Sequence, residues 1–201
     1  MKKILVMFAL LAVSFAGINA QENVRWGATL GMNSSKFSAD GFDSKIGFHA
    51  GVKAEMGLPQ IAEGVYLDMG ALLSLKGAKV NLGSGDIKYT PYYLEVPVHM
   101  GYKYAVNENF AVFGNAGPYI AVGLFGKAKA DGVEVDNTSD NVFDEDGGGM
   151  NRFDFGLGLK FGVEFCQKYQ VSFGYDWGLI DNADHISNKN RNLMISLSCF
   201  F

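Results

Sequence analysis

Acidic and basic side chains alternate with apolar ones along much of this chain, and eleven of them could share one polar interior. Five positive groups and six negative groups nearly balance, so they could line an ion path or form a network that neutralises its own buried charges. Which alternative holds depends on the elements that carry them. The eleven residues are Arg25, Lys53, Glu55, Asp68, Lys76, Glu95, Lys103, Asp154, Lys160, Glu164 and Asp176.

Histidine and serine residues raise the question of metal binding or catalysis. His49 and His99 share the polar register with the acidic side chains, so a metal site can be imagined, but lone histidines in a polar interior are more often network members. Asp184 and His185 lie near Ser187, yet no Ser-His-Asp arrangement at an exposed loop stands out. We therefore expect no enzyme, no metal and no cofactor, with a barrel hydrolase as an alternative.

The segment from residue 131 to residue 146 is rich in carboxylates and precedes three glycines. Calcium favours such oxygen clusters. The spacing does not match an EF-hand loop, in which a glycine follows the third acidic position and a glutamate closes the loop. We expect a solvated surface loop and leave calcium binding open. The acidic residues are Asp131, Glu134, Asp136, Asp140, Asp144, Glu145 and Asp146.

The composition favours strands over helices and excludes two broad classes. Hydrophobic residues make up 48% of the 201 residues and charged residues 19%, which excludes intrinsic disorder. The 26 glycines and 13% aromatic residues, with only 4 prolines, are typical of many strands and turns. The 17 basic and 21 acidic residues give a net charge of −4, which argues against a nucleic-acid partner.

The first twenty residues have the pattern of a secretory signal peptide. Lys2 and Lys3 precede an almost wholly apolar run from residue 4 to residue 17, and Ala20 supplies a small residue at the expected cleavage point. The apolar run is shorter than the ~20 residues that a spanning helix needs. We expect residues 1–20 to be removed and residues 21–201 to form one domain.

A period of two residues dominates the rest of the chain. From Ile46 to Leu58, the even positions are all apolar and the odd positions are glycine or polar, so a strand would separate the two sets onto opposite faces. Similar patterns predict eight strands. The predicted strands cover residues 24–33, 46–58, 65–76, 92–104, 110–125, 153–165, 169–179 and 193–201.

The connections between these strands alternate in length. Long polar segments are expected at residues 34–45, 77–91, 126–152 and 180–192, and short ones at residues 59–64, 105–109 and 166–168. Antiparallel strands joined in this way place every long loop at one end, as in outer-membrane barrels with long extracellular loops. The sequence therefore predicts an all-β fold, a closed eight-stranded antiparallel up-and-down transmembrane β-barrel with both termini in the periplasm.

The two faces of these strands differ in a way that indicates a membrane barrel. One face is bulky and apolar, whereas the other combines charged residues with many glycines. Glycine weakens a solvated strand, but it suits the narrow interior of an eight-stranded barrel. We therefore expect the apolar face to contact outer-membrane lipid, with aromatic residues at both interfaces. Eight strands leave room only for side chains, so the charge network is favoured over an ion path.

Several segments resemble known outer-membrane proteins. The C-terminal run that ends in Leu197, Cys199 and Phe201 looks like the terminal signal read by the barrel-assembly machinery. Residues 93–98, 117–120 and 153–157 resemble the PorT-like outer-membrane β-barrel family of Bacteroidetes-type bacteria. The resemblance implies an outer-membrane location and says little about activity.

Two prolines depart from an ideal barrel. Pro97 and Pro118 fall inside predicted adjacent strands, and neither has an N–H to donate. Each is expected to remove one ladder hydrogen bond or to lie at a bulge.

Three function classes remain open at this point. The favoured one is an integral outer-membrane protein with a structural or surface-interaction role, whose extracellular loops bind a ligand that the sequence does not identify. The alternatives are a narrow transport channel or secretion-associated barrel, and a barrel enzyme.

Overall fold

The computed structural model describes residues 23–38, 42–81, 86–130, 141–143, 150–183 and 186–201. These residues form one antiparallel sheet that closes on itself, because the first strand pairs with both the second and the last. The strands are β1 (Val24–Phe37), β2 (Phe42–Gly57), β3 (Val65–Leu75), β4 (Ala78–Asn81), β5 (Asp86–Asn107), β6 (Phe110–Ala130), β7 (Phe153–Phe165), β8 (Tyr169–Ala183) and β9 (Ile186–Phe200).

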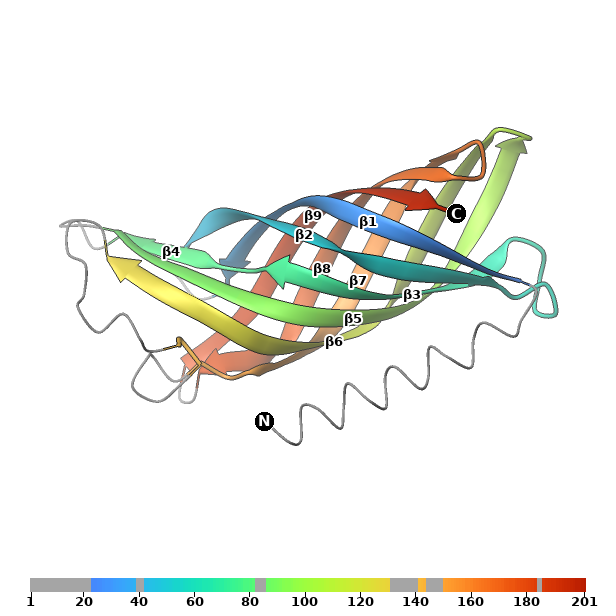
Figure 1. Ribbon diagram of the computed structural model, residues 1–201. Helices are drawn as coiled ribbons and strands as arrows, with labels where there is room; N and C mark the ends of the chain where they lie inside the picture. The colour runs from blue at the N-terminus through green and yellow to red at the C-terminus, as the bar shows by residue number, and fades with distance from the viewer. Residues whose placement is uncertain (1–22, 39–41, 82–85, 131–140, 144–149, 184–185) are drawn as a thin grey trace.

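Strands β3 and β4 are two parts of one interrupted strand. Both pair with β2 on one side and with β5 on the other, and only Lys76 and Gly77 separate them. The predicted closed eight-stranded antiparallel barrel is therefore confirmed for the described residues (Figure 1). No helix among them is long and apolar enough to cross a membrane.

The barrel has two distinct ends. Residues 58–64, 108–109 and 166–168 connect strands at the end where β9 finishes, which we call the turn end. The opposite end, which carries β4, is the rim end (Figure 1). At the turn end the connection after β7 is tight: Cys166 and Gln167 both have positive φ, and the Lys168 N–H donates to the Phe165 carbonyl at 3.0 Å.

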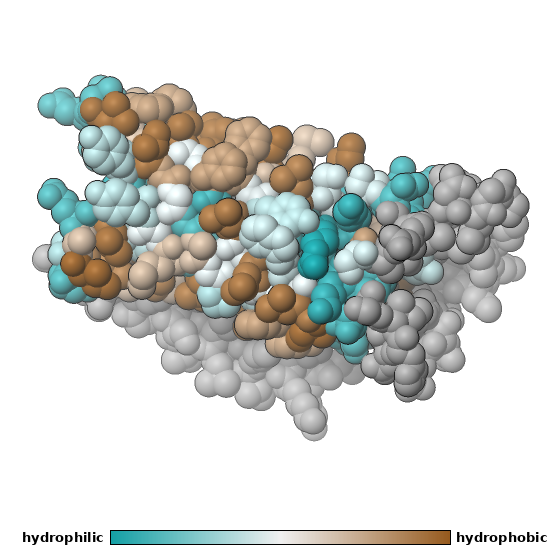
Figure 2. Space-filling view, turned by 180° about the vertical axis from the view of Figure 1, so that it is seen from behind, coloured by the Kyte–Doolittle hydropathy of each residue, from teal (hydrophilic) through white to brown (hydrophobic). Residues whose placement is uncertain are grey.

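The predicted faces are confirmed by burial. Leu30, Met32 and Phe48 are each more than half exposed on the outer wall, whereas Thr29, Asn33 and other residues of the polar register are buried inside. Figure 2 shows apolar side chains over much of one side of the wall, with hydrophilic side chains toward its ends. An apolar exterior around a polar interior is the reverse of a water-soluble barrel.

The strands are longer than the sequence pattern predicts. Much of residues 34–45, 77–91 and 180–192, expected as long loops, belongs to β1, β2, β4, β5, β8 and β9. Ser35 pairs with Lys45, and Lys36 pairs with Arg191, so polar residues continue the ladder beyond the apolar wall. A tilted strand needs only ~9–11 residues to cross a bilayer. With 22 and 21 residues, β5 and β6 are about twice that length.

The two prolines interrupt the ladder without shifting its register. The pairing of β5 with β6 stops after Pro97 and Tyr119 and resumes at Met100 and Ala116 with the same offset. The missing pairs include the one that would join Val98 to Pro118. The first of the two expectations therefore holds: local hydrogen bonds are lost and no bulge forms at either proline.

Candidate functional site in the barrel interior

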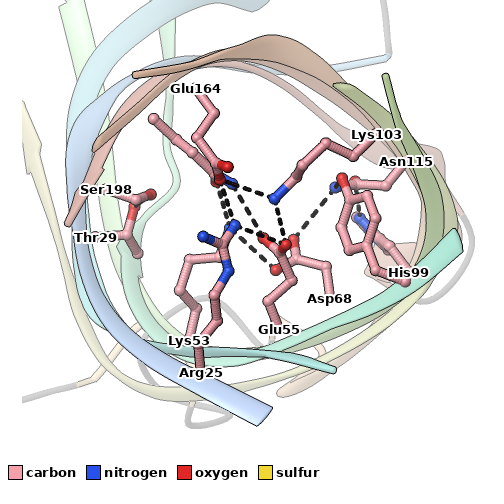
Figure 3. Close-up of polar contacts among 12 residues, drawn as sticks. Arg25, Thr29, Lys53, Glu55, Asp68, His99, Lys103, Asn115, Glu164 and Ser198 are labelled. Carbon is pink, nitrogen blue, oxygen red and sulfur yellow. Dashed lines mark hydrogen bonds and ion pairs between the residues drawn. The ribbon is translucent and has the colours of Figure 1, made fainter. Parts of the chain in front are cut away.

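Charged side chains from several strands meet inside the barrel near the turn end (Figure 3). Arg25, Glu55, Asp68 and His99 are register partners on β1, β2, β3 and β5, so the pleat places all four on the inner face. We call the six charged residues that meet at this end the turn-end group. It consists of Arg25, Lys53, Glu55, Asp68, Lys103 and Glu164.

Two cations and two carboxylates form the centre of the turn-end group. Arg25 Nη2 lies 2.7 Å from Glu55 Oε1 and is also paired with Glu164. Lys103 Nζ lies 2.8 Å from Glu164 Oε2 and is also paired with Glu55. Gln170 Nε2 donates to Glu55 Oε2 at 3.0 Å and to Glu164 Oε2 at 2.8 Å. Each carboxylate thus has both charge neutralisation and hydrogen bonds.

A branch of the same group continues along β2 and β3. Lys53 Nζ lies 3.0 Å from Asp68 Oδ1, and Asn115 Nδ2 donates to the Tyr66 hydroxyl at 3.0 Å. His99 Nδ1 lies 3.0 Å from Asn115 Oδ1, so this ring is held by an amide (Figure 3). His49 is held similarly by Asn33 and Ser196, at 2.7 and 2.9 Å.

A second cluster, the rim-end group, consists of Lys76, Glu95, Asp154 and Asp176, all of which are almost completely buried. Lys76 Nζ lies 2.6 Å from Glu95 Oε2 and 3.7 Å from Asp154 Oδ2. It also lies 4.4 Å from the centre of the Tyr119 ring, a favourable cation–π distance. Lys76 comes from the break between β3 and β4.

The carboxylates of the rim-end group also accept neutral hydrogen bonds. Asp154 Oδ2 accepts from the Tyr119 hydroxyl at 3.2 Å and from Asn190 Nδ2 at 2.9 Å. Asn192 Nδ2 lies 3.4 Å from Asp176 Oδ2. Ten of the eleven predicted interior residues therefore divide into two clusters, six at the turn end and four at the rim end.

Lys160 joins neither cluster by an ion pair within the described part of the chain. With His49, Lys53 and Asp68, it lines a cavity of about 20 Å³ between the two clusters. That volume holds about one water molecule.

Apolar residues close the interior at the rim end, beyond the rim-end group. Val142, Phe143 and Met150 are buried against inward-facing residues of the strands, and we call these three residues the inner plug. The Phe143 ring packs edge-on against Tyr93, with ring centres 5.5 Å apart. The Val142 N–H donates to the Gly126 carbonyl at 3.2 Å, which ties the plug to β6.

The match to a family model covers most of the chain. Residues 19–184 match the model described as outer membrane protein beta-barrel domain. The chain belongs to this family. No curated relative matches it.

Solved structures of outer-membrane proteins are similar to this chain at low sequence identity. Ail of Yersinia pestis, in complex with the heparin analogue sucrose octasulfate, is 16% identical with a TM-score of 0.48, over 89% of this chain and 99% of that one. Neisserial surface protein A is 14% identical with a TM-score of 0.48, over 88% and 97%. OprG from Pseudomonas aeruginosa is 14% identical with a TM-score of 0.43, over 89% and 94%.

Membership of the family makes the protein an integral outer-membrane barrel of Gram-negative type, whose outer wall contacts lipid. The three residues of the predicted assembly signal lie on that wall: Leu197 and Phe201 are exposed and Cys199 is half-buried. Because side chains alternate along the strand, Phe200 lies on the inner face. Its ring centre is 4.1 Å from the Arg25 guanidinium.

The sequence interpretation missed the aromatic residues of this outer-membrane barrel's interior. Tyr66, Phe113 and Tyr119 stand in the polar register and are buried, and each ring lies against a glycine of another strand. A Cβ on Gly156 would lie 2.6 Å from Tyr119 Cε1, and one on Gly162 would lie 2.8 Å from Phe113 Cζ. The interior glycines therefore make room for specific rings. The sequence held a signal for this, because these aromatic residues stand at the inward-facing positions of the alternating pattern.

Two segments considered for catalysis or calcium binding fall largely outside the described residues. Asp184 and His185 lie outside them, and so do all seven acidic residues between 131 and 146. Within the part of the chain that the structure describes, no group of three or more His, Cys, Asp or Glu side chains could hold a metal ion.

A charge on the lipid-facing wall tests the assignment of the faces. Val52 is 50% exposed and pairs with Ala28 and Ala71 in the middle of the wall. Val52→Lys is expected to lower the free energy of unfolding by about 2–4 kcal/mol, because it places an ammonium near the bilayer midplane. Urea unfolding of the protein in lipid vesicles measures the loss.

Ile46→Lys is the matched control, since Ile46 lies on the same face of β2 but six residues closer to the rim. Near the interface the loss should be only ~0–1 kcal/mol. Equal losses at both positions would contradict a membrane-embedded wall.

Proposed function

We propose that the protein is a non-conducting outer-membrane barrel with a structural or surface-interaction role, which it performs through its rim end. The interior charges serve to hold the barrel shut and in shape, and no catalysis takes place there. A single observation carries this proposal: side chains fill the lumen from the turn-end group to the inner plug.

The size of the remaining space supports a closed lumen. The cavity between the two charge clusters, about 20 Å³, is too small for a hydrated ion or a sugar. Above it, Val142 and Phe143 contact inward-facing residues of β5 and β6. A solute would have to displace both the paired charges and the apolar plug.

The proposed orientation places the rim end outside the cell and both termini in the periplasm. The longest connection, between β6 and β7, starts at the rim end, whereas the turn-end connections are short, which is the usual arrangement of such barrels. Residues 1–20 act as a signal peptide, and the barrel-assembly machinery reads Leu197, Cys199 and Phe201. Within its family we assign the chain to the PorT-like barrels, and the resemblance of residues 93–98, 117–120 and 153–157 supports this assignment.

Single-channel recording distinguishes this role from that of a narrow channel. The folded protein in a planar bilayer is expected to give no steady conductance. Phe143→Ala, which removes the aromatic ring of the plug, should also stay silent, because the turn-end group still fills the lumen. A steady conductance from the unaltered protein would favour the channel and refute the closed interior.

A further inference from the structure

Lysines from neighbouring strands lie side by side at the rim end. Lys79 of β4 is the direct partner of Lys88 of β5, which is in turn the direct partner of Lys129 of β6. One step closer to the wall, Thr90 of β5 pairs with Lys127 of β6. We call Lys45, Lys79, Lys88 and Lys127 the lysine group.

Lys45 reaches the same place from β2. Its Nζ donates to the Tyr89 carbonyl at 3.0 Å and to the Thr90 hydroxyl. Gly77, in the break between β3 and β4, leaves the space for this side chain, since a Cβ there would lie 3.0 Å from Lys45 Cδ. The chain thus positions an additional cation beside the paired lysines.

Like charges opposite one another destabilise a sheet unless an anion lies between them. The arrangement stands out in a chain whose net charge is −4. Repulsion from Lys79 and Lys88 acts on the Lys45 ammonium. Asp43 is the register partner of Lys79, and in the described part of the chain the four lysines outnumber the acidic residues in register with them.

The paired lysines of the group share the face of the strands that contacts lipid. In β5, Tyr93 and Glu95 are buried inside, so Lys88, Thr90 and Tyr92 belong to the outer register. Tyr92 stacks on Phe125 with ring centres 4.8 Å apart, as expected of an aromatic belt at the membrane interface. Lys88 lies four residues beyond Tyr92, or about 13 Å along the strand.

We propose that the lysine group binds the phosphate groups of a lipid in the outer leaflet. Its lysines lie just beyond the aromatic belt, and long side chains can reach back to phosphates at the surface of the membrane. The occupant is a lipid and not a soluble anion, because the cations continue the lipid-facing register of β5 and β6. The inference rests on the proposed orientation of the rim end, but lipid binding and ion conductance are measured independently.

Binding of diphosphoryl lipid A to the full barrel in detergent tests the proposal, with the same lipid after dephosphorylation as the comparison. Native mass spectrometry or thermophoresis measures Kd. Removal of one lysine in Lys88→Gln should weaken binding about fivefold, and the triple change Lys79→Gln, Lys88→Gln, Lys127→Gln about 100-fold. All three positions are on the outside of the barrel, so the heat-modifiable fold should be retained.

Lys168→Gln is the matched control, because Lys168 is an exposed lysine at the turn end. It should leave lipid A binding unchanged. Inorganic pyrophosphate and a soluble sulfated polysaccharide form the other arms. The proposal fails if the triple variant binds like the unaltered protein, if dephosphorylated lipid binds equally well, or if a soluble anion binds as tightly as the lipid.

Discussion

Replacing Lys76 by methionine is expected to lower the free energy of unfolding by about 3–5 kcal/mol, the largest loss from a single interior side chain. Lys76 is fully buried, and its ammonium is the cation paired with Glu95 and Asp154. Methionine fills a similar volume, so the loss would come from the carboxylates that stay buried without their cation. Urea unfolding in lipid vesicles measures the change.

Lys103→Met is the comparison at the turn end. Lys103 is also paired with two carboxylates, but its side chain is 16% exposed, and Arg25 and Gln170 still contact both acids. Its loss should be clearly smaller. In addition, Lys76→Met with Glu95→Gln should recover part of the stability, because one uncompensated charge is removed. Equal losses for both lysines, or no recovery, would contradict a dry rim-end group.

Deleting Cys199, Phe200 and Phe201 is expected to abolish assembly of the barrel. Cys199 and Phe200 pair with Ala28 and Gly27 at the seam that closes the sheet, and the Phe201 N–H donates to the Trp26 carbonyl at 2.9 Å. Without them the end of β1 would expose unpaired N–H and C=O groups to lipid, at several kcal/mol each. Heat-modifiable protein in the outer-membrane fraction measures assembly.

Deleting Asp144, Glu145 and Asp146 removes the same number of residues from a connection and should leave the barrel intact, because loop length costs little in closure entropy. Two single variants then separate the causes. Phe201→Ala keeps the backbone pairing and alters only the lipid-facing signal, whereas Phe200→Ala removes the ring beneath Arg25. Equal yields of heat-modifiable barrel from the two deletions would contradict a special role of the terminal strand in assembly.

The closed barrel and its faces could be predicted from the sequence because a strict alternation leaves little choice. In Ile46–Leu58 a shift of one residue would move every apolar side chain to the interior. The ends of the strands could not be predicted in the same way. Ser35, Lys45 and Lys79 continue the ladder beyond the apolar wall, where the outer face is polar and the strict alternation of the wall is lost.

The alternation along each strand was enough to identify the interior residues, but it could not predict which of them form each charge cluster. Alternation places Arg25 and Lys76 on the inner face, yet only the register between distant strands shows which carboxylates they meet. The plug was beyond prediction for a different reason. Val142 and Phe143 belong to a segment without periodicity, and their position depends on the room left beside Gly123 and Tyr93.

The extension of the strands past the apolar wall affects how this surface can evolve. A binding surface made of loops can gain or lose residues one at a time. Here Lys79 and Lys88 are fixed in place by the ladder, and a one-residue insertion in β5 on either side of Lys88 would turn part of the strand inside out. Changes in length should therefore be tolerated in steps of two residues, and new specificity should arise mainly by substitution.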